Sequence, residues 1–238
     1  YLSDTDRRRL LLLLSQMRMV CDSTYILDQQ SRHDTKVDEA VNIINNIAES
    51  DGGKVVVFSQ WERMTRLIAQ ELEKSGILYE YLHGGVPSVK RKELMDSFNE
   101  NPDIRVFIST DAGCTGLNLQ TASYLINMDL PWNPAVLEQR IGRIYRIGQR
   151  NNIQVINLVS AGTIEEQMLG KLRFKSSMFA GALDGGENDV LLEGNRLQEL
   201  VNQFDFTSEP AERPLAEEQP EEKSEITVPE KNVDVETP

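Results

Sequence analysis

The chain has 238 residues, with 25 Lys and Arg against 38 Asp and Glu and a formal net charge of −13. This length accommodates one core of about 150 to 200 residues together with appendages. Eleven acids and three bases lie in residues 205–238, so the rest of the chain is only mildly acidic and its charge does not exclude a nucleic-acid partner. The longest apolar run, residues 10–14, is far too short for a membrane span or a signal-peptide core.

The cysteine pattern indicates neither a metal site nor a disulfide framework. Cys21 and Cys114 lie far apart, and neither has a second Cys or His at ligand spacing. We therefore expect no metal ligands and a reducing, intracellular compartment such as the cytoplasm.

The N-terminal region is predicted to be helical. Apolar residues recur at helical spacing through residues 1–30, and we assign residues 1–35 to a helical segment that leads into the domain. A second helix is expected over residues 36–49, because Asp51, Gly52 and Gly53 follow it directly.

Strands and helices then alternate. Strands are predicted at 54–58, 78–82, 105–109, 124–128 and 154–159, and helices at 62–75, 89–99 and 135–145. The first strand, KVVVF, has a continuous apolar run after its lysine, which is typical of a strand buried on both faces of a parallel sheet. The pattern predicts an α/β fold with a doubly wound parallel sheet, whose ligand lies at the carboxyl ends of the strands.

The C-terminal region divides into three parts by composition. A helix is expected from residue 163 to about 183 and completes a domain of residues 36–183. A short closing helical segment is expected within 184–204, and the acidic tail 205–238, rich in Glu and Pro, is predicted to be disordered.

The most informative motif is EQRIGRIYRIGQ, residues 138–149. On a helix its spacing would place Gln139, Arg143 and Arg146 on one face. Paired guanidinium groups can bind phosphate oxygens and stabilise the charge that develops during phosphoryl transfer. From spacing alone, a solvated basic helix is an equally good interpretation.

This motif resembles motif VI of the superfamily-two helicases, and its RIGQ ending is similar to the Swi/Snf branch. The resemblance implies a RecA-like helicase C-terminal lobe in which Arg143 and Arg146 are arginine fingers, with Gln139 beside the nucleotide. Many eukaryotic members have a small residue where this chain has Arg140, so the chain looks closer to bacterial members such as the RNA-polymerase-recycling ATPases.

Residues 109–122, STDAGCTGLNLQTA, follow a predicted strand and resemble motif V. The hydroxyls of Ser109 and Thr110 are candidates for binding a nucleic-acid backbone, while the resemblance implies nucleotide contacts from Asp111 and Gly116. Gly113 and Gly116 favour a tight turn, which is by itself a weak signal because many such turns are only structural.

Three further segments resemble the family's nucleic-acid-binding blocks. Motif IV of the family is similar to VVVFSQW (55–61), and the block that follows motif IV is similar to YLHGGVP (81–87). The family's segment before motif VI is similar to MDLPWNP (128–134). The implied nucleic-acid contacts are Ser59, Gln60, His83, Gly84 and Trp132. Trp132 is equally consistent with a packing role, and His83 has no partner in sequence that would indicate acid/base or metal chemistry.

The chain lacks a phosphate-binding GxxxxGK[ST] loop and a Mg²⁺-binding acidic box. We therefore expect ATP and Mg²⁺ to be bound mainly by a first RecA-like lobe of the same polypeptide, and this chain alone to be inactive. The activity that the resemblance implies is ATP-dependent translocation on double-stranded DNA. The alternatives are a strand-separating helicase lobe and a non-catalytic lobe that binds a protein such as RNA polymerase.

Overall fold

The computed structural model describes residues 3–50, 52–113, 116–145, 152–170 and 172. Its centre is a sheet of five parallel strands in the order β2-β3-β1-β4-β5. The strands are β1 (Lys54–Ser59), β2 (Tyr79–Leu82), β3 (Val106–Thr110), β4 (Ala122–Asn127) and β5 (Gln154–Asn157). The prediction of five strands in a parallel, doubly wound sheet is confirmed.

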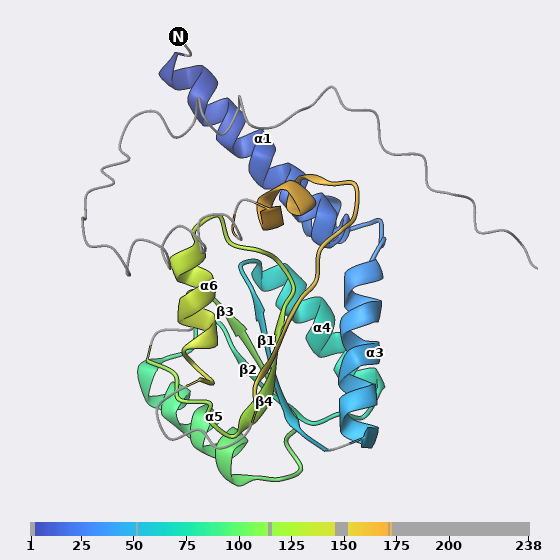
Figure 1. The fold of residues 1–238 in the computed structure, drawn as a ribbon, viewed down its shortest axis with the longest axis vertical. Coiled ribbons are helices and arrows are strands. Elements are labelled where there is room, and N and C mark those ends of the chain that lie inside the picture. Colours follow the sequence, from blue (N-terminus) through green and yellow to red (C-terminus); the bar gives the residue numbers. More distant parts are fainter. Residues whose placement is uncertain (1–2, 51, 114–115, 146–151, 171, 173–238) are drawn as a thin grey trace, which may run out of the picture. The chain divides into compact units, whose positions relative to one another are not determined.

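Helices cover both faces of this sheet (Figure 1). On one face α3 (Thr35–Ser50) and α4 (Glu62–Lys74) pack against Val55 and Val57 of β1. On the other lie α5 (Ser88–Glu100) and α6 (Pro134–Ile141), where Phe98 and Ile144 pack against Val56 and Phe58. Because alternate side chains of β1 point to opposite faces, its VVVF run supplies both halves of the core.

The N-terminal helix is shorter than the sequence indicates. Helix α1 (Asp4–Asp22) begins with a capping box at Ser3, and a separate short helix, α2 (Tyr25–Asp28), follows it. The helix ends at Asp22, and the hydroxyl of the next residue, Ser23, donates to Asp34 (2.6 Å) and accepts from the Tyr25 amide (3.1 Å). The expectation of one helix through residue 30 is therefore wrong, since serine competes for backbone partners.

The C-terminal extension is described as far as residue 172. Residues 164–170 and 172 are helical, and Ile164 packs against Leu14 of α1. The predicted continuation to 183, the closing segment 184–204 and the acidic tail lie outside the described residues. No helix within the described ranges has the length and apolarity needed to cross a membrane.

Candidate nucleotide-facing pocket

Three neighbouring strands end together at one edge of the sheet. In the register of the sheet, Ser59 of β1 lies beside Thr110 of β3, and Phe58 lies beside Asn127 of β4. The residues that follow these strands, among them Gln60, Asp111 and Asp129, therefore emerge at the same edge. This is the carboxyl edge, where open parallel sheets bind ligands.

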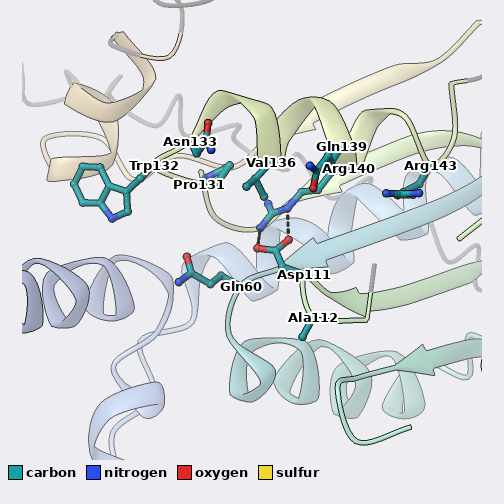
Figure 2. A pocket seen from close by; sticks show the side chains of 10 residues that line it. All are labelled: Gln60, Asp111, Ala112, Pro131, Trp132, Asn133, Val136, Gln139, Arg140 and Arg143. Atoms are coloured by element: carbon teal, nitrogen blue, oxygen red, sulfur yellow. Dashed lines mark hydrogen bonds and ion pairs between the residues drawn. The ribbon is translucent and has the colours of Figure 1, made fainter. Parts of the chain in front are cut away.

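A pocket of about 550 Å³ opens at this edge. Figure 2 shows Trp132 and Gln60 towards one end of it and Arg143 at the other, with Arg140 and Asp111 between them. Five of its lining residues are ones that the sequence singled out for nucleotide or nucleic acid. The full lining is Gln60, Asp111, Ala112, Pro131, Trp132, Asn133, Val136, Gln139, Arg140 and Arg143.

The centre of the pocket wall is Arg140, whose side chain is fully buried. Its guanidinium donates to both carboxylate oxygens of Asp111, at 2.7 and 2.9 Å. It also donates to the Asn127 side chain (3.1 Å) and to the carbonyl and carboxylate of Asp129 (2.9 and 3.1 Å). A single side chain thus joins α6 to the ends of β3 and β4.

The surroundings of Arg140 favour its charged form. Burial opposes the charge, but the hydrogen bonds and negative charges of Asp111 and Asp129 outweigh it and raise the pKa of Arg140. The sequence-based interpretation noted Arg140 only as a family difference and missed this role. The sequence did contain a signal for this role. Asp111 directly follows β3 and Asp129 lies two residues after β4, and a carboxylate at the end of a buried strand needs a cation.

Arg143 lies three residues further along but in a different environment. It is only half-buried, and its Nε has no hydrogen-bond partner among the described residues. The predicted helix to residue 145 is wrong, because α6 ends at Ile141 and the Arg143 carbonyl accepts from the Leu119 amide (3.0 Å). Arg143 is therefore held on a turn at the pocket, while Arg146 lies outside the described residues.

Asp129 connects this pocket to the end of β1. Its carboxylate accepts from the Ser59 hydroxyl and from the Gln60 amide (2.8 Å). Ser59 is therefore buried with an internal partner, while the side chain of Gln60 is exposed. Nucleic-acid binding through Ser59 and Gln60 remains a prediction, and in this conformation only Gln60 presents a side chain for it.

The motif V hydroxyls are also buried. The Ser109 hydroxyl donates to the Thr110 carbonyl (3.0 Å), whereas the Thr110 hydroxyl has no partner in the described parts of the chain. Of these two candidate nucleic-acid ligands, Thr110 thus keeps an unused donor. Their contact with nucleic acid also remains a prediction.

The His83-Gly84 turn lies next to the motif V turn. A Cβ built on Gly84 would lie 3.5 Å from the Cβ of Ala112, which lines the pocket. His83 Nδ1 accepts from the Gly85 amide (3.2 Å), and its ring lies 5.3 Å from that of Tyr81. The turn brings His83 and Gly84 close to the pocket, although neither lines it.

Different structural features explain why glycine occupies the two positions in motif V. A Cβ on Gly113 would lie 3.1 Å from both Leu82 Cγ and Ser109 Oγ, so this position needs a glycine for close packing. Gly116 has φ +77°, a backbone conformation that favours glycine, but it does not line the pocket. The predicted nucleotide contact of Gly116 remains a prediction. Within the described ranges, no cluster of His, Cys, Asp or Glu side chains is arranged to hold a metal ion.

Together, the fold and this edge define a RecA-like α/β domain with a pocket in which Arg140 pairs with Asp111 and Asp129, and Arg143 lines the same pocket. Residues 35–148 match the family described as the helicase conserved C-terminal domain. The chain is 34% identical over 184 residues to the "Uncharacterized ATP-dependent helicase YqhH" of Bacillus subtilis, covering 77% of this chain and 31% of that protein. It is 35% identical over 187 residues to the "DNA repair protein RAD5B" of Arabidopsis thaliana, covering 77% of this chain and 14% of that protein.

Solved structures agree with these relatives. The SWI2/SNF2 ATPase core of Sulfolobus solfataricus in complex with dsDNA matches with a TM-score of 0.65 and 29% identity, covering 78% of this chain and 40% of that chain. The chain belongs to the Swi/Snf family, as a RecA-like helicase C-terminal lobe. It spans less than a third of the curated relatives compared above.

Proposed function

We propose that this chain is the second lobe of an ATP-dependent translocase or remodeller that acts on double-stranded DNA. The observation that carries the proposal is the pocket at the carboxyl edge, whose lining includes Arg143, and no ion pair of the described residues involves this arginine. The named activities of the relatives and the duplex bound to the Sulfolobus core support the same activity.

The pocket residues fit a phosphate group better than a cationic ligand. Arg140 already neutralises Asp111 and Asp129, and the described residues place no acid in an ion pair with Arg143. Gln139 is exposed and lines the same wall, so it adds an amide donor. An arginine facing such a site can stabilise phosphoryl-transfer charge, which is worth about a thousandfold or more in rate.

The division of labour between two lobes belongs to the same proposal. ATP supplies the phosphoryl group and is bound with Mg²⁺ mainly by a first RecA-like lobe of the same polypeptide. This chain supplies Arg143 and Arg146 as fingers, with Gln139 and Asp111 at the pocket wall. Gln60, Thr110, His83, Gly84 and Trp132 then form the side that meets the duplex, in the bacterial nucleoid or the eukaryotic nucleus.

Two alternatives from the sequence remain to be separated from this proposal. A strand-separating helicase lobe would displace one strand of a duplex, whereas a translocase would not. A non-catalytic lobe that binds RNA polymerase would have no use for Arg143 at an anion-facing pocket, and the polypeptide would not hydrolyse ATP.

ATP turnover measured with and without duplex DNA tests the proposal, on a polypeptide that carries both lobes and on this chain alone. We expect DNA-stimulated turnover only in the two-lobe polypeptide. Turnover by this chain alone would show a complete nucleotide site here and contradict the division between lobes. Absence of turnover in both would favour the binding-only alternative.

A further inference from the structure

We infer that Arg18 of α1 is a positioning residue that holds the Gln60 and Trp132 end of the pocket and thereby sets how tightly duplex DNA is coupled to ATP turnover. The inference rests on the proposed function. Neither the motifs nor the site residues predicted from the sequence include Arg18.

Arg18 is a buried cation in an unusual setting. It is 1% exposed, and its guanidinium carbon lies over two indole rings, 5.7 Å from the centroid of Trp61 and 5.4 Å from that of Trp132. Cations over aromatic faces are attracted by the ring quadrupole, more strongly when water is excluded. The side chain therefore fixes α1 to residues on two different loops.

Two hydrogen bonds connect Arg18 to the segments that line the pocket. Arg18 Nη1 donates to the Gln60 side-chain oxygen (3.0 Å), and Nη2 donates to the Leu130 carbonyl (2.7 Å), two residues before Trp132. Both Gln60 and Trp132 line the pocket, whereas Arg18 does not. Arg18 thus acts through these residues and has no contact with the ligand itself.

The position within the pocket indicates which ligand is affected. Gln60 and Trp132 lie towards the end opposite Arg143, and the buried Arg140–Asp111 pair lies between the two ends (Figure 2). Loss of Arg18 should therefore disturb the predicted DNA contacts more than the predicted nucleotide contacts.

The same helix provides a matched control one turn further on. Asp22 accepts from Lys36 (2.7 Å), which also pairs with Glu165, and none of these three side chains lines the pocket. A general loosening of α1 would follow from substitution at either position. A positioning role predicts an effect on DNA coupling from Arg18 alone.

The test uses a two-lobe polypeptide with Arg18→Met, Arg18→Lys or Asp22→Asn. For Arg18→Met we expect the duplex concentration for half-maximal stimulation to rise about tenfold, the size of one lost charge-assisted hydrogen bond, with the KM for ATP within about twofold. Arg18→Lys keeps the cation and should restore part of the coupling. Asp22→Asn should leave the half-maximal concentration unchanged.

A spectroscopic readout accompanies the kinetics. The chain has two tryptophans, Trp61 and Trp132, and both face Arg18. In this chain alone, Arg18→Met should change tryptophan emission and its quenching by acrylamide, whereas Asp22→Asn should not. Equal shifts in half-maximal DNA for Arg18→Met and Asp22→Asn, or parallel shifts in the KM for ATP, would overturn the inference. Absence of any DNA stimulation in the unsubstituted protein would instead refute the proposed function.

Discussion

Arg140 and Arg143 are two arginines of one motif with opposite environments. Arg140 is fully buried and donates to Asp111, Asn127 and Asp129, while Arg143 is half-buried with an Nε that has no partner in the described residues. The first arginine holds the pocket wall together, and the second lines the same pocket without an ion pair to any described residue. The comparison teaches that arginines of one basic motif can have different environments, and that only their partners separate a structural cation from one that we propose to bind a ligand.

The largest effect on stability is expected at Arg140. Arg140→Met would leave Asp111 and Asp129 without their cation, which costs about 3 to 5 kcal/mol for a broken buried ion pair. Denaturant unfolding of this chain measures the loss. Arg66→Met is the control, because Arg66 is exposed and its pair with Glu62 is a surface ion pair, which contributes little to stability. Equal losses for the two variants would show that the Arg140 cluster does not hold the pocket together.

A smaller loss is expected at Gly113. Gly113→Ala would introduce a Cβ 3.1 Å from Leu82 Cγ and Ser109 Oγ, and such overpacking costs about 1 to 3 kcal/mol. Gly170→Ala is the matched control, since its Cβ would meet nothing within 4 Å and residue 170 is helical. Thermal unfolding should show a lower Tm for the first variant and an unchanged or higher Tm for the second. A Gly113→Ala protein as stable as the parent would contradict the close packing of the motif V turn.

The third expected effect depends on pH. Burial, followed by the negative charge of Asp129, raises the pKa of Asp22 well above its usual range. A raised folded pKa gives stability that is complete below the carboxyl's ordinary pKa of about 4 and is lost as the pH rises through the folded value. The parent should therefore lose stability with rising pH relative to Asp22→Asn, which cannot ionise. The measurement is the unfolding free energy of both proteins from below pH ~4 upwards. Parallel pH dependences of the two unfolding free energies would refute the raised pKa of Asp22.

The smallest effect on stability is expected at Arg143. No ion pair of the described residues involves Arg143, so Arg143→Ala should change the free energy of unfolding by less than about 1 kcal/mol. The same denaturant experiment applies. A loss as large as that of Arg140→Met would mean that Arg143 is a second structural cation.

The sequence was sufficient for the sheet and for much of the pocket. The β-branched run of β1 and the alternation of strand and helix patterns after it predicted all five strands, and the motifs indicated five pocket residues, among them Gln60 and Arg143. Helix ends were less predictable, because α6 ends where Leu119, from a distant segment, bonds the Arg143 carbonyl. Arg140 could not be assigned from its own motif, since its acceptors come from two other segments and meet only in the folded chain.

The central claim is that Arg143 faces the nucleotide while Arg140 builds its site. The most direct test is ATP turnover of a two-lobe polypeptide that carries Arg143→Ala, with duplex DNA present and with folding and DNA binding measured on the same preparation. We predict a fall of about a thousandfold in stimulated turnover, with stability and DNA affinity kept. Turnover equal to that of the parent would contradict the claim that this pocket completes an ATPase site.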